Sequence, residues 1–450
     1  MSKVLETKDK LNLFANAPVK TVVIKNVLPS IAAMIMVLIY NLADTFFIGQ
    51  TGDALQVAAV SLATPVFLLF MAIGNIYGLG GTSVISRALG QGNKEYARKV
   101  CSFCFWSCCI IGVILTICFL VFMDPLLKLI GASPATWEFT KTYLTIVAFS
   151  GPCAMIATTY TNIIRTEGAS VQAMTGQIVG NVLNIILDPI MILGFHWNIA
   201  GAALATLLAN VVSTAYYLLY FSKGKSILSI AFKDFSLNKE YIKAIYAIGF
   251  PASLGFNLMS ISQVIVNGLM AGYGDMALAS IGVAMKVSMI TTMVAMGIGQ
   301  GVQPILGYCV GAKLWTRFKQ ILHFSLAFSF LLSLFITIFC YFFTINIVQA
   351  FLTNPTAIKY AVTFVHIFLT TSVLFGVYYV LNNTLQAMGD ANGSFIINVS
   401  RQGIIYIPML FILNKALGIN GVAWSQPAAD ILSTLLVFLL YQRALKTHIE

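Results

Sequence analysis

Long apolar stretches separated by short polar segments run along the whole chain. Each reaches about 18 residues or more, enough for a helix to cross a lipid bilayer. A transmembrane β-barrel would instead show apolar and polar positions alternating over about ten residues. The pattern therefore predicts an all-α polytopic membrane protein with twelve transmembrane helices. They are expected at 21–47, 56–80, 101–122, 139–163, 174–194, 200–221, 245–271, 278–303, 321–344, 360–384, 395–413 and 419–441.

Composition and charge agree with this pattern and add an orientation. Of the 450 residues, 59% are hydrophobic and 9% charged, whereas soluble proteins carry about 25% charged residues. With both termini inside, twenty Lys and Arg residues fall in cytoplasmic segments and four in external ones. Since basic residues are retained on the cytoplasmic side, we expect cytoplasmic N- and C-termini in a plasma membrane. The net charge of +11 then reflects topology and a lipid bilayer partner, not nucleic acid.

The two halves of the chain resemble each other at a nearly constant shift. "GNIYG" at 74–78 matches "GIGQG" at 297–301, Pro189 matches Pro408, and "IAGAALA" at 199–205 matches "INGVAWS" at 419–425. The matches keep their order, which indicates an internal duplication.

Each half holds six spans, an even number, so both halves enter the membrane from the same side. This predicts two parallel six-helix repeats around a central cleft. The N-lobe would be 1–222 and the C-lobe 223–450, with a linker at about 222–244. Transporters built this way alternate access by rocking of the two lobes.

The stretch "NIILDPIMIL" places a carboxylate, Asp188, inside an apolar span. An ionisable residue there indicates function, because an unpaired charge in the membrane is costly. Asn181, Asn184 and Asp188 are spaced i, i+3, i+7 and share one helix face. Asp44 in the first span and Thr206 in the sixth lie at about the same depth, about four to six residues from the outer ends.

These five residues predict a cation or proton coupling site. Carboxylate, amide and hydroxyl oxygens suit H⁺ or Na⁺, and no imidazole or thiolate set points to a transition metal. Sodium would bind at Asp44, Asn184, Asp188 and Thr206; no other metal and no cofactor is expected. In the second half, the position that corresponds to Asp188 is Ile407, and we expect no acid within a span of that half. The alternative is two unrelated acids that reach water at the outer rim.

Four cysteines cluster in "CSFCFWSCC", residues 101–109. They open an apolar helix at its cytoplasmic end, where thiols stay reduced. We interpret them as small buried apolar residues rather than as a metal site.

The quoted motifs resemble the MATE (multidrug and toxic compound extrusion) family, within it the MepA-like and DinF-like bacterial branch. "NLADTFFIG", "NIIRTEG", "NVLNIILDPIMILGF" and "GAALAT" carry the resemblance, which covers nearly the whole chain. It implies a drug/cation antiporter, with Asp44, Asn184, Asp188 and Thr206 matching that branch's N-lobe cation site. Another branch carries acids in spans seven and ten. "LGFNLMSISQVIV" and "LFGVYYVLNNTLQ" contain none, so a C-lobe ion site is not expected.

A cavity with two acids and few bases favours small-molecule drugs and organic cations. Aromatic faces and flexible thioethers suit such promiscuous binding, although each side chain could equally be packing. The candidate substrate-binding residues are Tyr40, Asp188, Gln263, Met289, Met293 and Gln303. The roles of Lys286 and His366, both within spans, stay open.

These observations predict a secondary active multidrug efflux transporter driven by H⁺ or Na⁺ and acting as a monomer. A lipid-linked oligosaccharide flippase of the same superfamily is one alternative. It would need basic side chains for phosphates, yet only Lys286 and Arg401 lie within spans. A metabolite exporter is another. No nucleotide-binding GxxxxGK[ST] motif and no nucleophile–base set indicates a primary pump or an enzyme.

Overall fold

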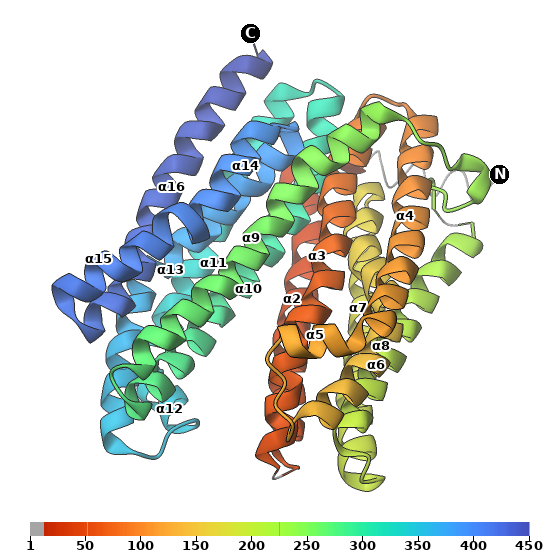
Figure 1. Ribbon diagram of the computed structural model, residues 1–450. Coiled ribbons are helices and arrows are strands. Elements are labelled where there is room, and N and C mark those ends of the chain that lie inside the picture. Colours follow the sequence, from red (N-terminus) through yellow and green to blue (C-terminus); the bar gives the residue numbers. More distant parts are fainter. Residues whose placement is uncertain (1–12, 52, 225, 450) are drawn as a thin grey trace. The chain divides into compact units, whose positions relative to one another are not determined.

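The computed structural model describes residues 13–51, 53–224 and 226–449, and every regular element there is helical (Figure 1). The α-helices are α2 (Val19–Gly49), α3 (Ala54–Gly90), α4 (Lys94–Val121), α5 (Met123–Leu129), α6 (Trp137–Ile163), α7 (Ser170–Pro189), α8 (Asn198–Ser222), α9 (Lys239–Ala271), α10 (Asp275–Gly311), α11 (Trp315–Phe342), α12 (Thr344–Gln349), α13 (Pro355–Met388), α14 (Ala391–Val399), α15 (Ile407–Leu417) and α16 (Ile419–Ile449). Two short 3₁₀ turns are η1 (Ile164–Glu167) and η3 (Phe232–Asp234), and two π-helical turns are η2 (Ile190–Gly194) and η4 (Ser400–Tyr406).

Twelve spans in the described part of the chain are long and apolar enough to cross a membrane. The prediction of an all-α protein with twelve transmembrane helices is therefore confirmed. The fifth span is α7 continued by η2, and the eleventh is α14, η4 and α15 in series. The short helices α5 and α12 follow the third and ninth spans, so they occupy corresponding places in the two halves.

Polar residues between the spans begin the helices. Asp53 accepts a hydrogen bond from the Leu55 N–H and caps α3, and Asn93 accepts one from Tyr96 N–H and caps α4. Asn354 and Asp390 cap α13 and α14 in the same way. Such caps satisfy N–H groups that the first turn of a helix leaves without a partner.

The described chain divides into two compact units. Unit 1 holds residues 13–15 and 36–249, and unit 2 holds residues 16–35 and 250–449. They differ from the contiguous segments 1–222 and 223–450, because residues 16–35, which include the first part of α2, pack with the second half. The linker packs with the first half, since Glu167 accepts hydrogen bonds from Ser226 Oγ at 2.9 Å and Ile227 N at 2.8 Å.

Glycines allow these exchanged segments to pack closely. In unit 2 a Cβ on Gly297 would lie 2.8 Å from the Ile31 Cα, and one on Gly301 would lie 2.8 Å from the Val27 Cα. In unit 1 a Cβ on Gly249 would clash with the Ile76 carbonyl of α3. Close backbone approach at small residues is how helices pack in a membrane, where lipid is as apolar as the interface. Gly297 and Gly301 belong to the repeated GxxxG motif, which therefore positions α2 against α10.

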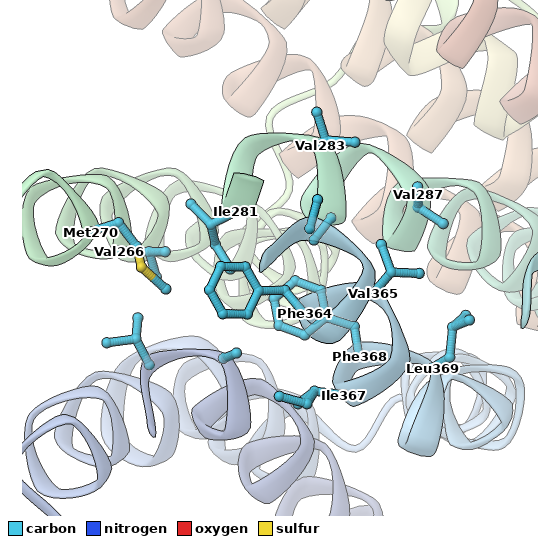
Figure 2. Close-up of a cluster of buried hydrophobic side chains, with 14 of the residues drawn as sticks. Val266, Met270, Ile281, Val283, Val287, Phe364, Val365, Ile367, Phe368 and Leu369 are labelled. Carbon is cyan, nitrogen blue, oxygen red and sulfur yellow. The ribbon is translucent and has the colours of Figure 1, made fainter. Parts of the chain in front are cut away.

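Each unit has its own apolar core. In unit 2, Phe364 and Phe368 of α13 lie beside Ile281 of α10 and Val266 and Met270 of α9 (Figure 2). A second cluster in unit 1 joins α2, α3, α5, α6 and α8 around residues such as Leu127, Leu144 and Ala203.

Two glycines bring α7 against α8, where the polar residues of the fifth and sixth spans meet. A Cβ on Gly176 would clash with the Tyr217 ring. One on Gly180 would clash with the Ser213 hydroxyl and come within 2.9 Å of the Ala209 carbonyl oxygen. The spacing of α7 and α8 therefore depends on these two positions.

We predict that Gly180→Ala destabilises the protein, because the added methyl group must push α7 away from α8. Overpacking costs about 1–3 kcal/mol, which lowers the melting temperature by roughly 2–10 °C for units of this size. Gly268→Ala in α9 is the matched control, because nothing lies within 4 Å of a Cβ at Gly268. Thermal unfolding in detergent measures both variants, and equal melting temperatures would refute the close-packing argument.

Candidate functional site

The candidate site lies in unit 1, where α7 and α8 meet. Asp188 and Asn184 of α7 are 0% and 1% exposed, and Thr206 of α8 is 5% exposed. One face of α7 carries these polar groups because Asn181, Asn184 and Asp188 follow the helical repeat. The π turn η2 begins directly after Pro189, and such turns are frequent at functional sites.

Asn184 links the carboxylate of α7 to the backbone of α8. In the amide orientation that satisfies both ends, its Nδ2 donates to Asp188 Oδ2 at 2.9 Å and its oxygen accepts from Thr206 N–H at 3.1 Å. The opposite orientation would turn the amide oxygen toward the carboxylate and leave a 3.4 Å contact from Nδ2 to the Thr206 hydroxyl. Hydrogen bonding decides the orientation of an amide, so Asn184 Nδ2 faces Asp188 and its oxygen faces Thr206.

The outer part of α2, which belongs to unit 1, adds a second carboxylate. Asp44 is half-buried and lies close enough to Asp188 for the two charges to interact. Tyr40, one turn earlier on α2, contacts the Thr206 hydroxyl and lies near both acids. The structure thus brings Tyr40, Asp44, Asn184, Asp188 and Thr206 into one cluster.

Sequence reasoning missed two further members of this region. Tyr143 of α6 is buried and lies near both Asp44 and Asp188. Gln177 continues the polar face of α7 one turn before Asn181, a spacing that the sequence already displays. Gln177 Oε1 and Asn181 Nδ2 are buried atoms without a hydrogen-bond partner in the described structure. No sequence motif indicates Tyr143, because its position near the acids follows from the packing of α6.

The cluster holds two acids without a compensating base. None of the ion pairs among the described residues includes Asp44 or Asp188. One oxygen of each, Asp44 Oδ1 and Asp188 Oδ1, is buried and has no hydrogen-bond partner within the described chain. Two neighbouring carboxylates cannot both stay ionised in an apolar site without a compensating cation. The arrangement can therefore take up a proton or a bound cation.

The donor set consists of oxygens. Two carboxylates, an amide, a hydroxyl and two phenols surround the cluster, and they are hard ligands suited to a small monovalent cation. Among the residues that the structure describes, no group of three or more His, Cys, Asp or Glu side chains is placed to hold a metal ion. Four cysteines of the 101–109 segment, three of them buried, line one helix instead; Cys101 and Cys108 contact the hydroxyls of Tyr160 and Thr159.

Comparison with known proteins places the chain in a family. The MatE family model matches residues 29–190 and, a second time, residues 251–412. The chain belongs to the MATE family. Two tandem matches of one model also support the duplication deduced from the repeated motifs.

Two curated MATE relatives are similar over most of their length. The multidrug export protein MepA of Staphylococcus aureus (strain MRSA252) is 31% identical over 444 residues, 97% of each chain. MepA of Staphylococcus haemolyticus (strain JCSC1435) is 32% identical over 419 residues, 92% of this chain and 91% of that one. A crystal structure of a MATE protein in complex with MaL6 has a TM-score of 0.92 at 24% identity and covers 97% of this chain and 98% of its own, which shows the MATE fold.

The remaining predicted substrate-binding residues of this MATE protein lie in unit 2. Gln263 of α9 is exposed, and Met289 and Met293 of α10 are half-buried. Gln303 is 1% exposed and donates to Gln386 Oε1 of α13 at 3.3 Å. Gln303 therefore contributes to packing between two helices, and a substrate role for all four residues stays a prediction.

Two residues with open roles also lie in unit 2. Lys286 Nζ lies 5.5 Å from the centre of the Phe351 ring. The His366 ring stacks on Tyr341 with 4.5 Å between centroids, which accounts for it as a packing residue.

The expectation that the second half has no acid within a span is wrong. Asp430 lies inside α16, is 2% exposed and forms an ion pair with Arg401 Nη2 at 3.0 Å. The acid itself is visible in the sequence, within the span expected at 419–441. The pairing itself joins residues from two different spans, so only the packed structure reveals it.

We predict that Asp44 and Asp188 repel each other when both are ionised. At pH 9, Asp44→Asn and Asp188→Asn should each raise the melting temperature, by roughly 2–4 °C per 1 kcal/mol of repulsion relieved. Because either change removes the same repulsion, the double variant should gain less than the sum of the two. Thermal unfolding of the four proteins measures this coupling. Asp124→Asn, an exposed acid paired with exposed Lys141, is the control, and additive effects would contradict proximity of the two charges.

Proposed function

We propose that this MATE protein is a secondary active multidrug efflux transporter. It exports amphipathic, mainly cationic compounds in exchange for H⁺ or Na⁺, with no cofactor besides the coupling ion. The observation that carries the proposal is the neighbouring acids Asp44 and Asp188, each with one buried oxygen that lacks a partner in the described structure. The names of the Staphylococcus relatives, which match over nearly the full chain, support the drug-export class. No catalytic chemistry on the substrate is needed for this activity.

In this proposal, the ion and the drug bind the same cluster in turn. When the acids are ionised, their charge attracts an organic cation and the aromatic faces of Tyr40 and Tyr143 stabilise it. When a proton or Na⁺ neutralises the acids, that attraction is lost and the drug leaves. Exchange follows because each ligand stabilises a different charge state of the site.

Conformational coupling is proposed to run through α2. This helix carries Tyr40 and Asp44 in unit 1, whereas its segment 16–35, which contains Pro29, packs in unit 2. A change in how α2 packs around Asp188 would therefore alter a helix that belongs to both units. Such a shared helix fits alternating access by rocking of two repeats.

H⁺ is the favoured coupling ion. Carboxylates in an apolar cluster accept protons readily, whereas Na⁺ needs several oxygens to replace its hydration shell. The same four residues, Asp44, Asn184, Asp188 and Thr206, would hold Na⁺ if sodium drives transport. The protein is proposed to act as a monomer in the plasma membrane with both termini in the cytoplasm, as the basic residues predict.

The packing of Arg401 further weakens the case for a flippase. Phosphate-bearing cargo requires basic side chains that are available for pairing. Arg401, one of the two basic residues expected within spans, is buried and bonded to Asp430. Of these two residues only Lys286 remains, which favours organic cations as substrates over phosphate-bearing cargo.

Efflux of a fluorescent organic cation from proteoliposomes tests the proposed function. A proton gradient and a sodium gradient are imposed in separate experiments, each with the higher ion concentration outside the vesicles. The gradient that drives efflux identifies the coupling ion. Asp188→Asn should lose the gradient-driven component by roughly tenfold or more, because coupling energies of this kind correspond to 5–150-fold effects. Asp124→Asn is the control with an unchanged site.

Two results would refute the proposal. One is the absence of gradient-driven efflux in folded wild-type protein under either gradient. The other is efflux by Asp188→Asn that responds to the gradient as wild type does.

A further inference from the structure

The second half of the chain carries a buried charge cluster that the proposed transport cycle does not use. Arg401 of η4 and Asp430 of α16 are 6% and 2% exposed. Arg401 Nη2 and Nε donate to Asp430 Oδ1 at 3.0 and 3.3 Å. Gln426 Nε2 donates to the same oxygen at 3.0 Å, and the Thr371 hydroxyl donates to Oδ2 at 3.4 Å.

Three aromatic rings of α13 surround the same guanidinium. The Arg401 Cζ lies 4.6 Å from the centre of the Tyr378 ring, 5.2 Å from Phe375 and 5.4 Å from Tyr379. Its Nη1 also donates to the Tyr379 hydroxyl at 3.1 Å. An acid and several aromatic faces around one cation form the kind of cage that binds organic cations in proteins. We call Phe375, Tyr378, Tyr379 and Asp430 the C-lobe cage.

The spans of the cage correspond to part of the acidic cluster of unit 1. That cluster takes residues from the first, fourth, fifth and sixth spans; the cage takes its residues from the tenth and twelfth, and Arg401 lies in the eleventh. Thr206 follows Gly201 by the same number of residues as Gln426 follows Gly421, within the matching motifs "GAALAT" and "GVAWSQ". The Thr206 N–H donates to Asn184, the partner of Asp188, and Gln426 Nε2 donates to Asp430. The duplication thus explains why polar groups gather at related places.

The two places differ in how their acids are satisfied. In unit 1, Asp44 and Asp188 each keep one oxygen without a partner in the described structure. In unit 2, both oxygens of Asp430 accept hydrogen bonds, and the positive charge comes from the chain itself. A covalently attached cation cannot exchange with the solution on either side of the membrane.

We propose that the C-lobe cage is a cation-binding site whose occupant is the side chain of Arg401. It is the counterpart of the acidic cluster in unit 1, with a tethered guanidinium in place of an exchangeable ion. Without the Arg401 side chain, the cage would bind guanidinium-type and small quaternary ammonium cations. The consequence that ion exchange is confined to unit 1 rests on the proposed function, whereas the cage itself does not.

Chemical rescue of Arg401→Ala tests the cage in the full-length protein in detergent. This variant keeps Asp430 and the rings but leaves the place of the guanidinium empty, so its melting temperature should fall. Guanidinium or methylguanidinium at about 10 mM should restore roughly 2–5 °C relative to the same concentration of NaCl, because a ligand that binds only the folded state stabilises it. Wild type should show no such shift.

Arg401→Ala with Asp430→Asn is the matched control, because it has the same cavity and no acid. Guanidinium should not raise its melting temperature. This double variant should also be more stable than Arg401→Ala, since an unpaired buried carboxylate destabilises the fold more than an uncharged amide does. Equal guanidinium shifts in the two variants, or none in folded Arg401→Ala, would overturn the proposal. Should Arg401→Ala fail to fold, equal failure of the double variant would overturn it, and recovery of folded protein would support it.

Release of the coupling ion on drug binding tests the consequence for ion exchange. Wild-type protein should release protons or Na⁺ when an organic cation is added, and Asp44→Asn with Asp188→Asn should release none. Release that persists in this double variant would show an exchangeable ion outside unit 1. Absence of ion release from wild type would instead contradict the proposed function. The guanidinium experiment would still show whether the C-lobe cage binds cations.

Discussion

A carboxylate buried among helices in a membrane must be neutralised, and this constraint governs the polar architecture of the protein. The cost of an uncompensated charge in an apolar interior exceeds what a few hydrogen bonds return. Asp188 is fully buried, has Asp44 as a neighbour and no base as a partner among the described residues. In the proposed function, a proton or cation neutralises the site, and this is how we propose that the protein responds to an ion gradient.

Helix packing holds this cluster in place. Gly176 and Gly180 allow α7 to approach α8, so that the Asn184 amide can join Asp188 to the Thr206 backbone. The same use of glycine recurs at Gly297 and Gly301, where the segment 16–35 of α2 packs on α10. Small residues thus determine both the local geometry of the site and the assignment of helix segments to units. Helix α2 carries Asp44 in unit 1, and its residues 19–35 belong to unit 2.

Duplication gave the two halves related positions for polar side chains, and each half neutralises its acid differently. Unit 1 leaves carboxylate oxygens without protein donors, whereas unit 2 surrounds Asp430 with Arg401, Gln426 and Thr371. A site that is saturated by its own side chains gains rigidity and loses the ability to exchange. The division of labour that we propose for the repeats rests on this difference in the hydrogen bonds of their acids.

The sequence by itself determined the twelve spans, the duplication and the face that joins Asn181, Asn184 and Asp188, because hydrophobicity and helical periodicity are local properties. It also placed Asp44 and Thr206 at the depth of Asp188, since depth follows from residue count along a helix. Only the tertiary structure decided that Tyr143 joins this cluster, that residues 16–35 pack with the second half, and that Arg401 neutralises Asp430. These depend on which faces of distant helices meet, and side-chain packing between spans leaves no local signal in the sequence.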